Sequence, residues 1–171
     1  VAVLGFIDIA GARRLLRWRR SEFVLAMTAF VGVAVLGVLW GVGIAITLSL
    51  LNFIRRAWRP HDAVLARVDN LKGYHDLERH PEGRLIPGLA LYRFDGPIFF
   101  ANAGMFRERV SALARSGGVR WIVVAAEPVT DIDVTGGEVL GALDEELQTA
   151  GVELAFAELK DPVRESLRRY G

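Results

Sequence analysis

The feature that most constrains the fold is an apolar segment, residues 23–54, which contains no Asp, Glu, Lys, Arg or His. A soluble domain rarely keeps charge out of so long a stretch, because charged side chains cover much of its surface. A helix that crosses a bilayer needs about 20 apolar residues. We therefore expect this segment to lie in a membrane.

Two arrangements of the segment are open, namely one steeply tilted helix or two short helices with a turn near Gly37, Gly41 and Gly43. Glycine lowers the cost of a turn or of close backbone contact. Arginines bracket both ends of the segment, at positions 13, 14, 17, 19 and 20 and at positions 55, 56 and 59. Basic clusters favour the cytoplasmic side of a membrane. This favours a transmembrane hairpin over residues 21–58, since a single span would place one cluster outside.

Small residues recur every four positions at Gly37, Gly41 and Ala45, a spacing that lets another helix approach. They are equally common residues of membrane helices in general. Four polar side chains of the segment are candidates for an ion path, although hydroxyls often bond their own helix backbone: Thr28, Thr47, Ser49 and Asn52. Each arm is short for a full crossing, so it is expected to depend on neighbouring helices.

Residues 1–20 are interpreted as the end of an earlier membrane span followed by a basic cytoplasmic loop. The apolar stretch 1–7 is too short to cross a bilayer by itself. The chain begins with Val and lacks the features of a signal peptide, so we expect a piece of a longer polypeptide.

Residues 59–85 are predicted to be a cytoplasmic linker, because prolines and glycines interrupt any helix there. The segment holds all three histidines of the chain, His61, His75 and His80. Their spacing matches neither a helical pair nor a zinc finger, and the chain has no cysteine. We therefore predict no metal site.

Residues 86–171 have the pattern of a small α/β domain. Runs that suit strands cover 89–94, 97–101, 121–126 and 152–157, with a tight turn at Asp95-Gly96. Helices are expected from Asn102 to about Gly117, from Gly136 to about Ala150, and from Asp161 to Tyr170. Strands that alternate with helices predict a mostly parallel sheet flanked by helices. We expect the aromatic residues Tyr92, Phe94, Phe99 and Phe100 to fill its core.

Two motifs in this domain resemble a known family. Residues 92–103 (YRFDGPIFFANA) resemble the opening of the STAS domain of SulP, or sulfate permease, transporters. Residues 129–136 (VTDIDVTG) resemble the strand-to-helix loop of STAS domains generally, and residues 58–65 and 74–81 are similar to the SulP linker. The resemblance implies the carboxy-terminal part of a SulP anion transporter, with its last transmembrane helices and a STAS domain.

This resemblance implies secondary active transport of a small inorganic anion such as sulfate or bicarbonate. The implied protein is a multi-pass protein of the inner or plasma membrane, with the STAS domain in the cytoplasm for assembly and regulation. The implied anion site lies upstream, so no substrate ligand is expected here. A homodimer through the membrane domain or the STAS domain is a further implication. A net charge of +1, with its arginines at the membrane edge, gives no reason to expect a nucleic-acid partner.

Related anti-sigma-factor antagonists carry a phosphorylated serine just before the loop glycine, which corresponds to Thr135 here. We therefore take Thr135 as a candidate regulatory phosphorylation site, within a loop that includes Asp131, Asp133 and Gly136. A phosphate at a helix start meets free amides and the positive end of the helix dipole. The alternative is structural, because Thr135 followed by Glu138 is a capping box.

The same loop could receive a nucleotide phosphate at the helix amides. This is disfavoured, because paired aspartates repel phosphate and the loop has no Walker-type lysine. No arrangement of Ser, His and Asp suggests catalysis, so we predict neither enzyme activity nor a cofactor. The rival function is a membrane-anchored STAS signalling module that binds a regulator and uses residues 23–54 only as an anchor.

Overall fold

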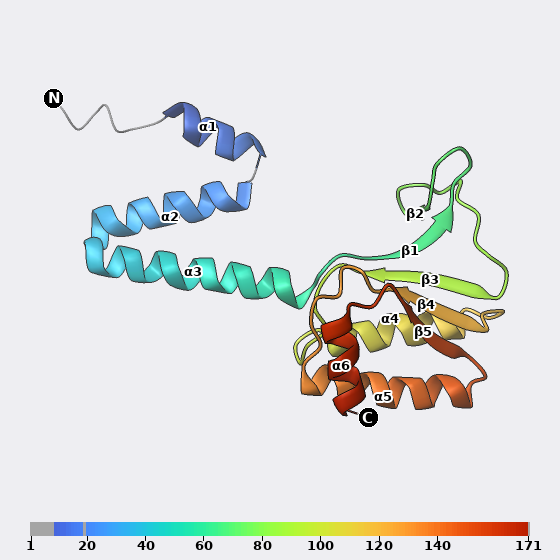
Figure 1. Cartoon of the computed structure of the whole chain (residues 1–171). Helices are drawn as coiled ribbons and strands as arrows, with labels where there is room; N and C mark the ends of the chain where they lie inside the picture. The colour runs from blue at the N-terminus through green and yellow to red at the C-terminus, as the bar shows by residue number, and fades with distance from the viewer. Residues whose placement is uncertain (1–8, 19, 171) are drawn as a thin grey trace. The chain divides into compact units, whose positions relative to one another are not determined.

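The computed structural model describes residues 9–18 and 20–170, so the predicted end of an earlier span at 1–7 lies outside the described residues. The chain divides into two units, Val1–Arg56 and Ala57–Gly171. The first unit is helical and the second is α/β (Figure 1). The helices of the first unit are α1 (Ile9–Trp18), α2 (Arg20–Leu36) and α3 (Val38–Trp58), the last of which ends just inside the second unit.

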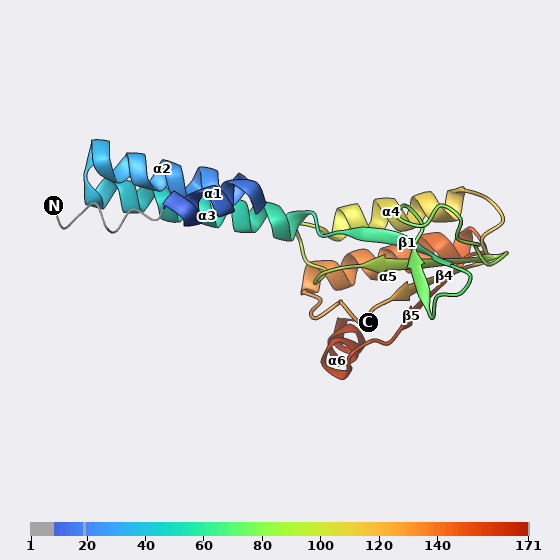
Figure 2. The same cartoon turned by 90° about the horizontal axis from the view of Figure 1, so that it is seen from above.

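Helices α2 and α3 form the hairpin that the glycines and the flanking arginines indicate. Gly37 separates them with a φ of 85°, a conformation that glycine adopts without the cost other residues bear. The two helices run side by side in opposite directions (Figures 1 and 2). At the open end of the hairpin a nitrogen of Arg56 lies 3.8 Å from a carboxylate oxygen of Glu22.

The arms of the hairpin touch through glycine. Gly32 and Gly41 are the buried residues of α2 and α3. A Cβ atom on Gly41 would lie 2.3 Å from the backbone nitrogen of Val33, which is too close for any side chain. The predicted small-residue face is thus used at Gly41, whereas Gly37 forms the turn.

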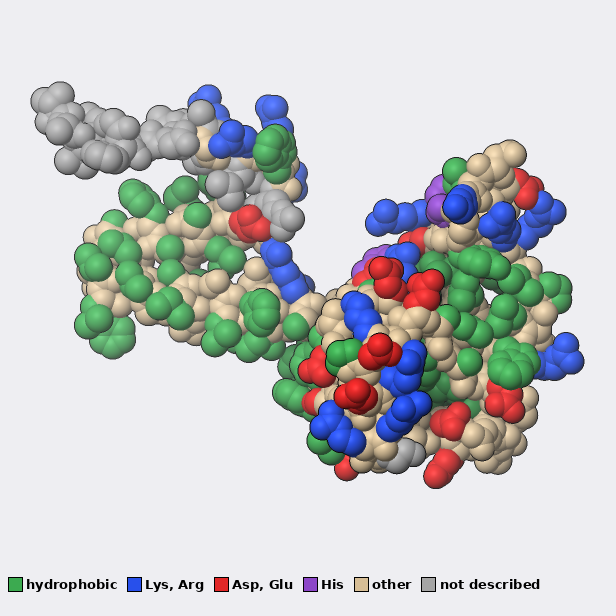
Figure 3. Space-filling model, viewed as in Figure 1, with side chains coloured by type: hydrophobic (Ala, Val, Ile, Leu, Met, Phe, Trp, Pro, Cys, Tyr) green, Lys and Arg blue, Asp and Glu red, His purple; other side chains and the backbone are tan. Residues whose placement is uncertain are grey.

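Large apolar side chains of the hairpin point outward, as the space-filling view shows (Figure 3). Trp40 is 69% exposed and Phe53 is 68% exposed. Among the described residues, α3 is the one helix whose length and apolar composition suit it to cross a membrane. Thr28 and Thr47 donate their hydroxyl hydrogens to Val24 and Gly43 carbonyls four residues earlier, so the structure favours the local role of these hydroxyls.

The second unit is a five-stranded mixed sheet with the strand order β2-β1-β3-β4-β5. β3, β4 and β5 are parallel, and β1 pairs antiparallel with both β2 and β3. Helices α4 and α5 pack against each other beside the sheet, and α6 packs against α5 (Figure 1). The bounds are β1 (Asp62–Arg67), β2 (Tyr74–Asp76), β3 (Leu89–Phe94), α4 (Ala103–Arg115), β4 (Trp121–Ala125), α5 (Val134–Thr149), β5 (Glu153–Ala157) and α6 (Asp161–Tyr170).

The α/β class and the parallel half of the sheet follow the sequence prediction, but two local expectations are wrong. Residues 59–85 are more than a linker, because β1 and β2 lie within them and β1 is paired on both sides, with β2 and β3. The segment 97–101 forms no strand beside β3. It makes a single parallel bridge, between Ile98 and Ile132, and β3 takes its antiparallel partner from β1 instead.

The core lies between the sheet and the helices α4 and α5. Tyr92 and Phe94 of β3 meet Phe106 of α4 edge to face, with ring centroids 5.8 and 5.4 Å from Phe106, and all three are fully buried. The prediction that all four aromatic residues of residues 92–100 fill the core is wrong for Phe100, which is 72% exposed. Trp121 is 49% exposed, so β4 is less covered than the expected buried strand.

A polar junction joins β1, β3 and α4 at the rim of this core. The Tyr92 hydroxyl donates to the Asp62 carboxylate at 3.1 Å, and Arg109 lies 3.2 Å from the same oxygen. Burial raises the pKa of Tyr92 well above its usual range, and the negative charge of Asp62 adds to the rise. The phenol therefore stays protonated and acts as a hydrogen-bond donor.

Candidate functional site

The two motifs of the sequence meet at the amino end of α5. The Ile98 N–H donates to the Asp131 carbonyl at 3.0 Å, and the Asp133 N–H donates to the Ile98 carbonyl at 3.2 Å. These bonds form the bridge between Ile98 and Ile132. Residues 97–102 and 129–137, two segments joined by these backbone bonds, together make up what we call the switch loop.

Asp133 holds the switch loop together. It is the N-cap of α5, and one of its carboxylate oxygens accepts the Gly136 N–H at 2.6 Å. The other oxygen accepts the Phe100 N–H at 3.0 Å. A carboxylate at a helix start also interacts favourably with the positive end of the helix dipole. One side chain thus caps α5 and fixes the segment that carries Phe100.

The expected capping box of Thr135 and Glu138 is wrong, because the helix begins earlier than Gly136. α5 starts at Val134, so Thr135 is its second residue and Asp133 takes the capping position. Within the described part of the chain the Thr135 hydroxyl makes no hydrogen bond, and the residue is exposed. The structure leaves the Thr135 hydroxyl open to solvent.

The Asp131 side chain is exposed, and among the described residues it accepts a hydrogen bond only from the neighbouring residue. Its carboxylate accepts the N–H of the next residue, Ile132, at 2.9 Å. Its carbonyl, rather than its side chain, joins the two parts of the switch loop. Asp131 and Asp133 therefore do not form a pair of converging carboxylates, which agrees with their expected role in turn and cap bonding.

Asn102 has a different role from the helix cap that the sequence suggests. It stands at the N-cap position of α4, but its side chain does not bond to the helix. Its oxygen instead accepts the Phe99 N–H at 2.9 Å, and its nitrogen donates to the carbonyls of Pro97 at 2.9 Å and Ala57 at 3.3 Å. The fully buried amide therefore ties the switch loop to the chain as it leaves α3.

Two glycines of the switch loop are required by packing. A Cβ on Gly136 would lie 2.8 Å from the Ile98 carbonyl, and a Cβ on Gly137 would lie 2.5 Å from the ring of Tyr170. The ring of Tyr170 in α6 thus rests on the first turn of α5. Sequence reasoning missed Tyr170, since no local pattern relates the end of α6 to residue 137.

The amides of Gly136 and Gly137, in the first turn of α5, are already occupied. The Gly136 N–H bonds to the Asp133 side chain and the Gly137 N–H bonds to the Asp133 carbonyl at 2.9 Å. A nucleotide phosphate would have to displace a carboxylate to reach them, at a cost in both hydrogen bonding and charge. Two large apolar side chains beside the capped turn are exposed, Phe100 by 72% and Val134 by 57%.

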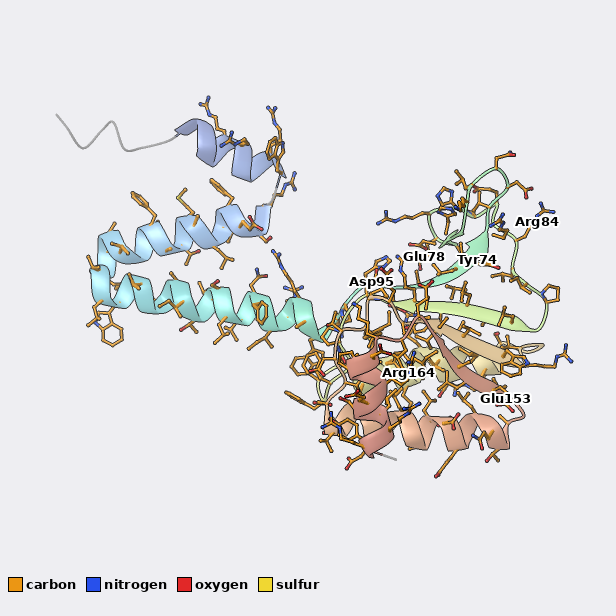
Figure 4. All side chains as sticks on the ribbon, viewed as in Figure 1. Tyr74, Glu78, Arg84, Asp95, Glu153 and Arg164 are labelled. Atoms are coloured by element: carbon orange, nitrogen blue, oxygen red, sulfur yellow. The ribbon has the colours of Figure 1, made fainter. Side chains whose placement is uncertain are left out.

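The three histidines lie at a second polar site, near the start of β1. With Asp76, Arg79, Arg93 and Asp95 they line a pocket of about 460 Å³. His61 lies 3.1 Å from Asp95 and 3.6 Å from Asp76, and Figure 4 labels Asp95 at the end of β3. Within residues 9–18 and 20–170 no group of three or more His, Cys, Asp or Glu side chains could hold a metal ion.

Comparisons with known proteins agree with this architecture. A protein named "Probable sulfate transporter" from Mycobacterium tuberculosis strain H37Rv is 42% identical over 169 residues, which are 98% of this chain and 30% of that protein. Sulfate transporter 1.1 of Arabidopsis thaliana is 31% identical over 166 residues, 91% of this chain and 26% of its own. The chain thus spans less than a third of the length of these relatives.

A solved structure shares the fold. The murine solute carrier 26 family member A9 anion transporter, in its inward-facing state, superposes with a TM-score of 0.81 at 19% identity, covering 95% of this chain and 26% of the transporter chain. A family model for the STAS domain matches residues 80–171. That match begins after β1 and β2, although both strands belong to the sheet. The predicted resemblance to sulfate transporters is confirmed, and, because the family model matches more than half of the chain, this chain belongs to the STAS domain family.

Proposed function

We propose that the chain is part of a membrane transporter of small inorganic anions, such as sulfate or bicarbonate, in which the second unit, residues 57–171, serves assembly and regulation. Because this unit contains the STAS match, we call it the STAS unit. The observation that carries the proposal is that similarity to sulfate transporters extends over 98% of the chain. It therefore includes the apolar hairpin as well as the STAS unit. A similarity confined to residues 80–171 would fit a free signalling domain equally well.

The exposed apolar side chains of α2 and α3 support a place in the membrane for residues 21–58. The arginines before and after the hairpin support a cytoplasmic side for both of its ends. The STAS unit follows α3 within a few residues of the sequence, so we place it in the cytoplasm. We place the transport path in other parts of the longer protein and assign no enzyme activity to this chain. Pairing of two copies, through the membrane domain or the STAS unit, belongs to the same proposal.

We further propose that the switch loop is the regulatory site, with Asp131, Asp133 and Gly136 as its frame and Thr135 as the group that is modified. The support is that the Thr135 hydroxyl is exposed beside Asp133, the side chain that fixes Phe100. A phosphate on Thr135 would bring about −1.5 to −2 charges close to that carboxylate. Repulsion would weaken the Asp133 bond to Phe100 and change the surface offered to a partner.

The direct test of transport is anion uptake by the full-length parent protein in liposomes, with labelled sulfate and bicarbonate compared in parallel. We expect uptake of at least one anion. A form that lacks residues 57–171 should show reduced or unregulated uptake. If the full-length protein carries neither anion, yet binds a soluble regulator through the STAS unit, the signalling module would replace the transporter as the function.

The test of the switch loop uses Thr135→Glu in the full-length protein, with Thr130→Glu as the matched control. Thr130 is also exposed and lies in the same loop, but it precedes the capped turn. We expect Thr135→Glu alone to change the uptake rate. Equal effects of the two variants, or no effect of either, would remove Thr135 as the regulatory position.

A further inference from the structure

Helix α1 carries a strongly basic site that the transport proposal does not use. Arg13, Arg14, Arg17 and Trp18 line a pocket of about 320 Å³. All four residues are exposed, Trp18 by 74%. The helix contains no acidic residue, so none of the residues that line the pocket balances its charge.

The chemistry of this pocket matches a phosphate group. Guanidinium groups bind phosphate oxygens through two parallel hydrogen bonds, which makes arginine the usual residue for phosphate recognition. Arg14 lies over the Trp18 ring, with its guanidinium carbon 5.9 Å from the ring centroid. This contact holds one guanidinium beside an aromatic face, so the cationic and apolar parts of the site are adjacent.

The apolar part of the site favours a lipid over a free phosphate. The exposed ring of Trp18 offers apolar surface that an inorganic anion does not use. Tryptophan is enriched at the membrane interface, where its amphipathic ring sits at the level of the lipid headgroups. One residue beyond α1 the chain enters α2, whose outer face is apolar, so the site stands directly before the hairpin.

We propose that Arg13, Arg14, Arg17 and Trp18 form a binding site for the headgroup phosphate of an anionic phospholipid. The arginines hold the phosphate, and Trp18 packs against the upper part of the lipid. This site rests on the proposed membrane location of the hairpin. Beyond that location, the site predicts that the chain prefers anionic over zwitterionic phospholipids.

The test uses the whole chain in nanodiscs with Trp18 as the sole tryptophan, after substitution of the exposed residues Trp40, Trp58 and Trp121 by Phe. Its fluorescence is quenched by phospholipids brominated on the acyl chain, either phosphatidylglycerol or phosphatidylcholine. We expect phosphatidylglycerol to quench at a much lower mole fraction. Equal quenching by the two lipids would overturn the site.

The variants replace Arg13, Arg14 and Arg17 by Gln, singly and together. Each charge near an anionic surface contributes about 1 kcal/mol, which is roughly fivefold in affinity. The triple variant should therefore need on the order of 100-fold more phosphatidylglycerol for half quenching. The matched control replaces Arg164, Arg168 and Arg169 of α6 by Gln, which removes the same charge and should leave the preference unchanged.

Two further measurements distinguish failure of the headgroup site from failure of the membrane location. Excess inorganic phosphate at constant ionic strength should not displace the lipid, and displacement would assign the pocket to a free anion and overturn the proposal. A second chain that retains only Trp40 reports on the hairpin, since both brominated lipids should quench it. If Trp40 is not quenched, the membrane location fails. If Trp40 is quenched but Trp18 shows no preference, only the headgroup site fails.

Discussion

The helical hairpin and the STAS unit use the same apolar side chains in opposite ways. Phe53 of α3 is 68% exposed, whereas Phe106 of α4 is fully buried. In the hairpin the buried contacts are made by glycine backbone, at Gly32 and Gly41, and the large side chains face outward. In the STAS unit the large side chains interlock inside.

The difference shows which solvent each unit suits. In water, burial of apolar area drives folding, so large side chains belong in a core. In lipid, apolar side chains gain nothing by turning inward, and close packing of small residues holds helices together instead. One chain thus contains two opposite patterns of packing, and each of the following experiments tests one side of that contrast.

The largest expected effect is that of Phe106→Ala, which removes the ring that contacts both Tyr92 and Phe94. Such a change in a packed core costs about 3–5 kcal/mol. The matched variant Phe53→Ala should leave the unfolding free energy of the STAS unit unchanged. Guanidinium unfolding of both variants in nanodiscs, followed by Trp121 fluorescence, measures this contrast. Similar losses for the two phenylalanines would contradict it.

The second largest effect is expected for Gly41→Ala, which should weaken the packing of α2 against α3. The new Cβ would overlap the Val33 backbone, and overpacking costs about 1–3 kcal/mol. Gly43→Ala is the control, because a Cβ there meets nothing within 4 Å. The chain has no cysteine, so a disulfide between Glu22→Cys and Arg56→Cys reports whether the arms stay together. Cross-linking should slow only with Gly41→Ala.

At the start of α5 the expected effect is smaller, and it distinguishes the structure from the sequence-based capping box. Asp133→Ala removes the cap and should cost about 1 kcal/mol of the free energy of unfolding. Thr135→Ala should cost close to nothing, because the structure gives Thr135 no capping bond. The free energies of unfolding of the two variants, measured with denaturant, show which residue caps α5. A larger loss for Thr135→Ala would restore the capping box and displace Asp133 from its role.

The smallest expected effect is a pH dependence at the surface of the STAS unit. The hydrogen bond from Arg107 lowers the pKa of Glu146. A carboxyl whose folded pKa is lowered stabilises the fold above its unfolded pKa, and this contribution is lost as the pH falls through the folded pKa. Acid unfolding should therefore begin at a slightly higher pH in Arg107→Gln. Glu145→Gln is the control, since Glu145 does not pair with Arg107, and an equal shift there would contradict the assignment.

Much of the architecture could be predicted from the sequence, because the patterns involved are local. The charge-free segment and its glycines predict the hairpin and its turn. The spacing of Phe106 and Val110 predicts α4, with both residues buried, and Asp161-Pro162 marks the start of α6. The motif around Thr135 located the switch loop. These features depend on residues a few positions apart, where periodicity and backbone preference act directly.

The errors lie where distant residues meet. Residues 59–85 read as a linker because two short strands among prolines and glycines carry little periodicity, and only pairing with β3 makes β1 a strand. Asn102 reads as a helix cap, yet burial beside Pro97 and Ala57 turns its amide toward the loop. Gly137 has no local explanation until Tyr170 rests on it. No pattern in the sequence encodes such contacts.

The sequence by itself thus determined which segment is apolar enough for a membrane, where helices α2 to α6 and the parallel strands β3, β4 and β5 lie, and which family loop lies at their junction. The tertiary structure decided that Asp133 rather than Thr135 caps α5, that Phe100 faces outward, and that β1 completes the sheet. The physical reason is the separation along the sequence of the residues that interact. Apolar periodicity acts over one or two turns of chain, whereas a hydrogen-bond partner or a buried face is assigned only when segments far apart in sequence compete for the same space.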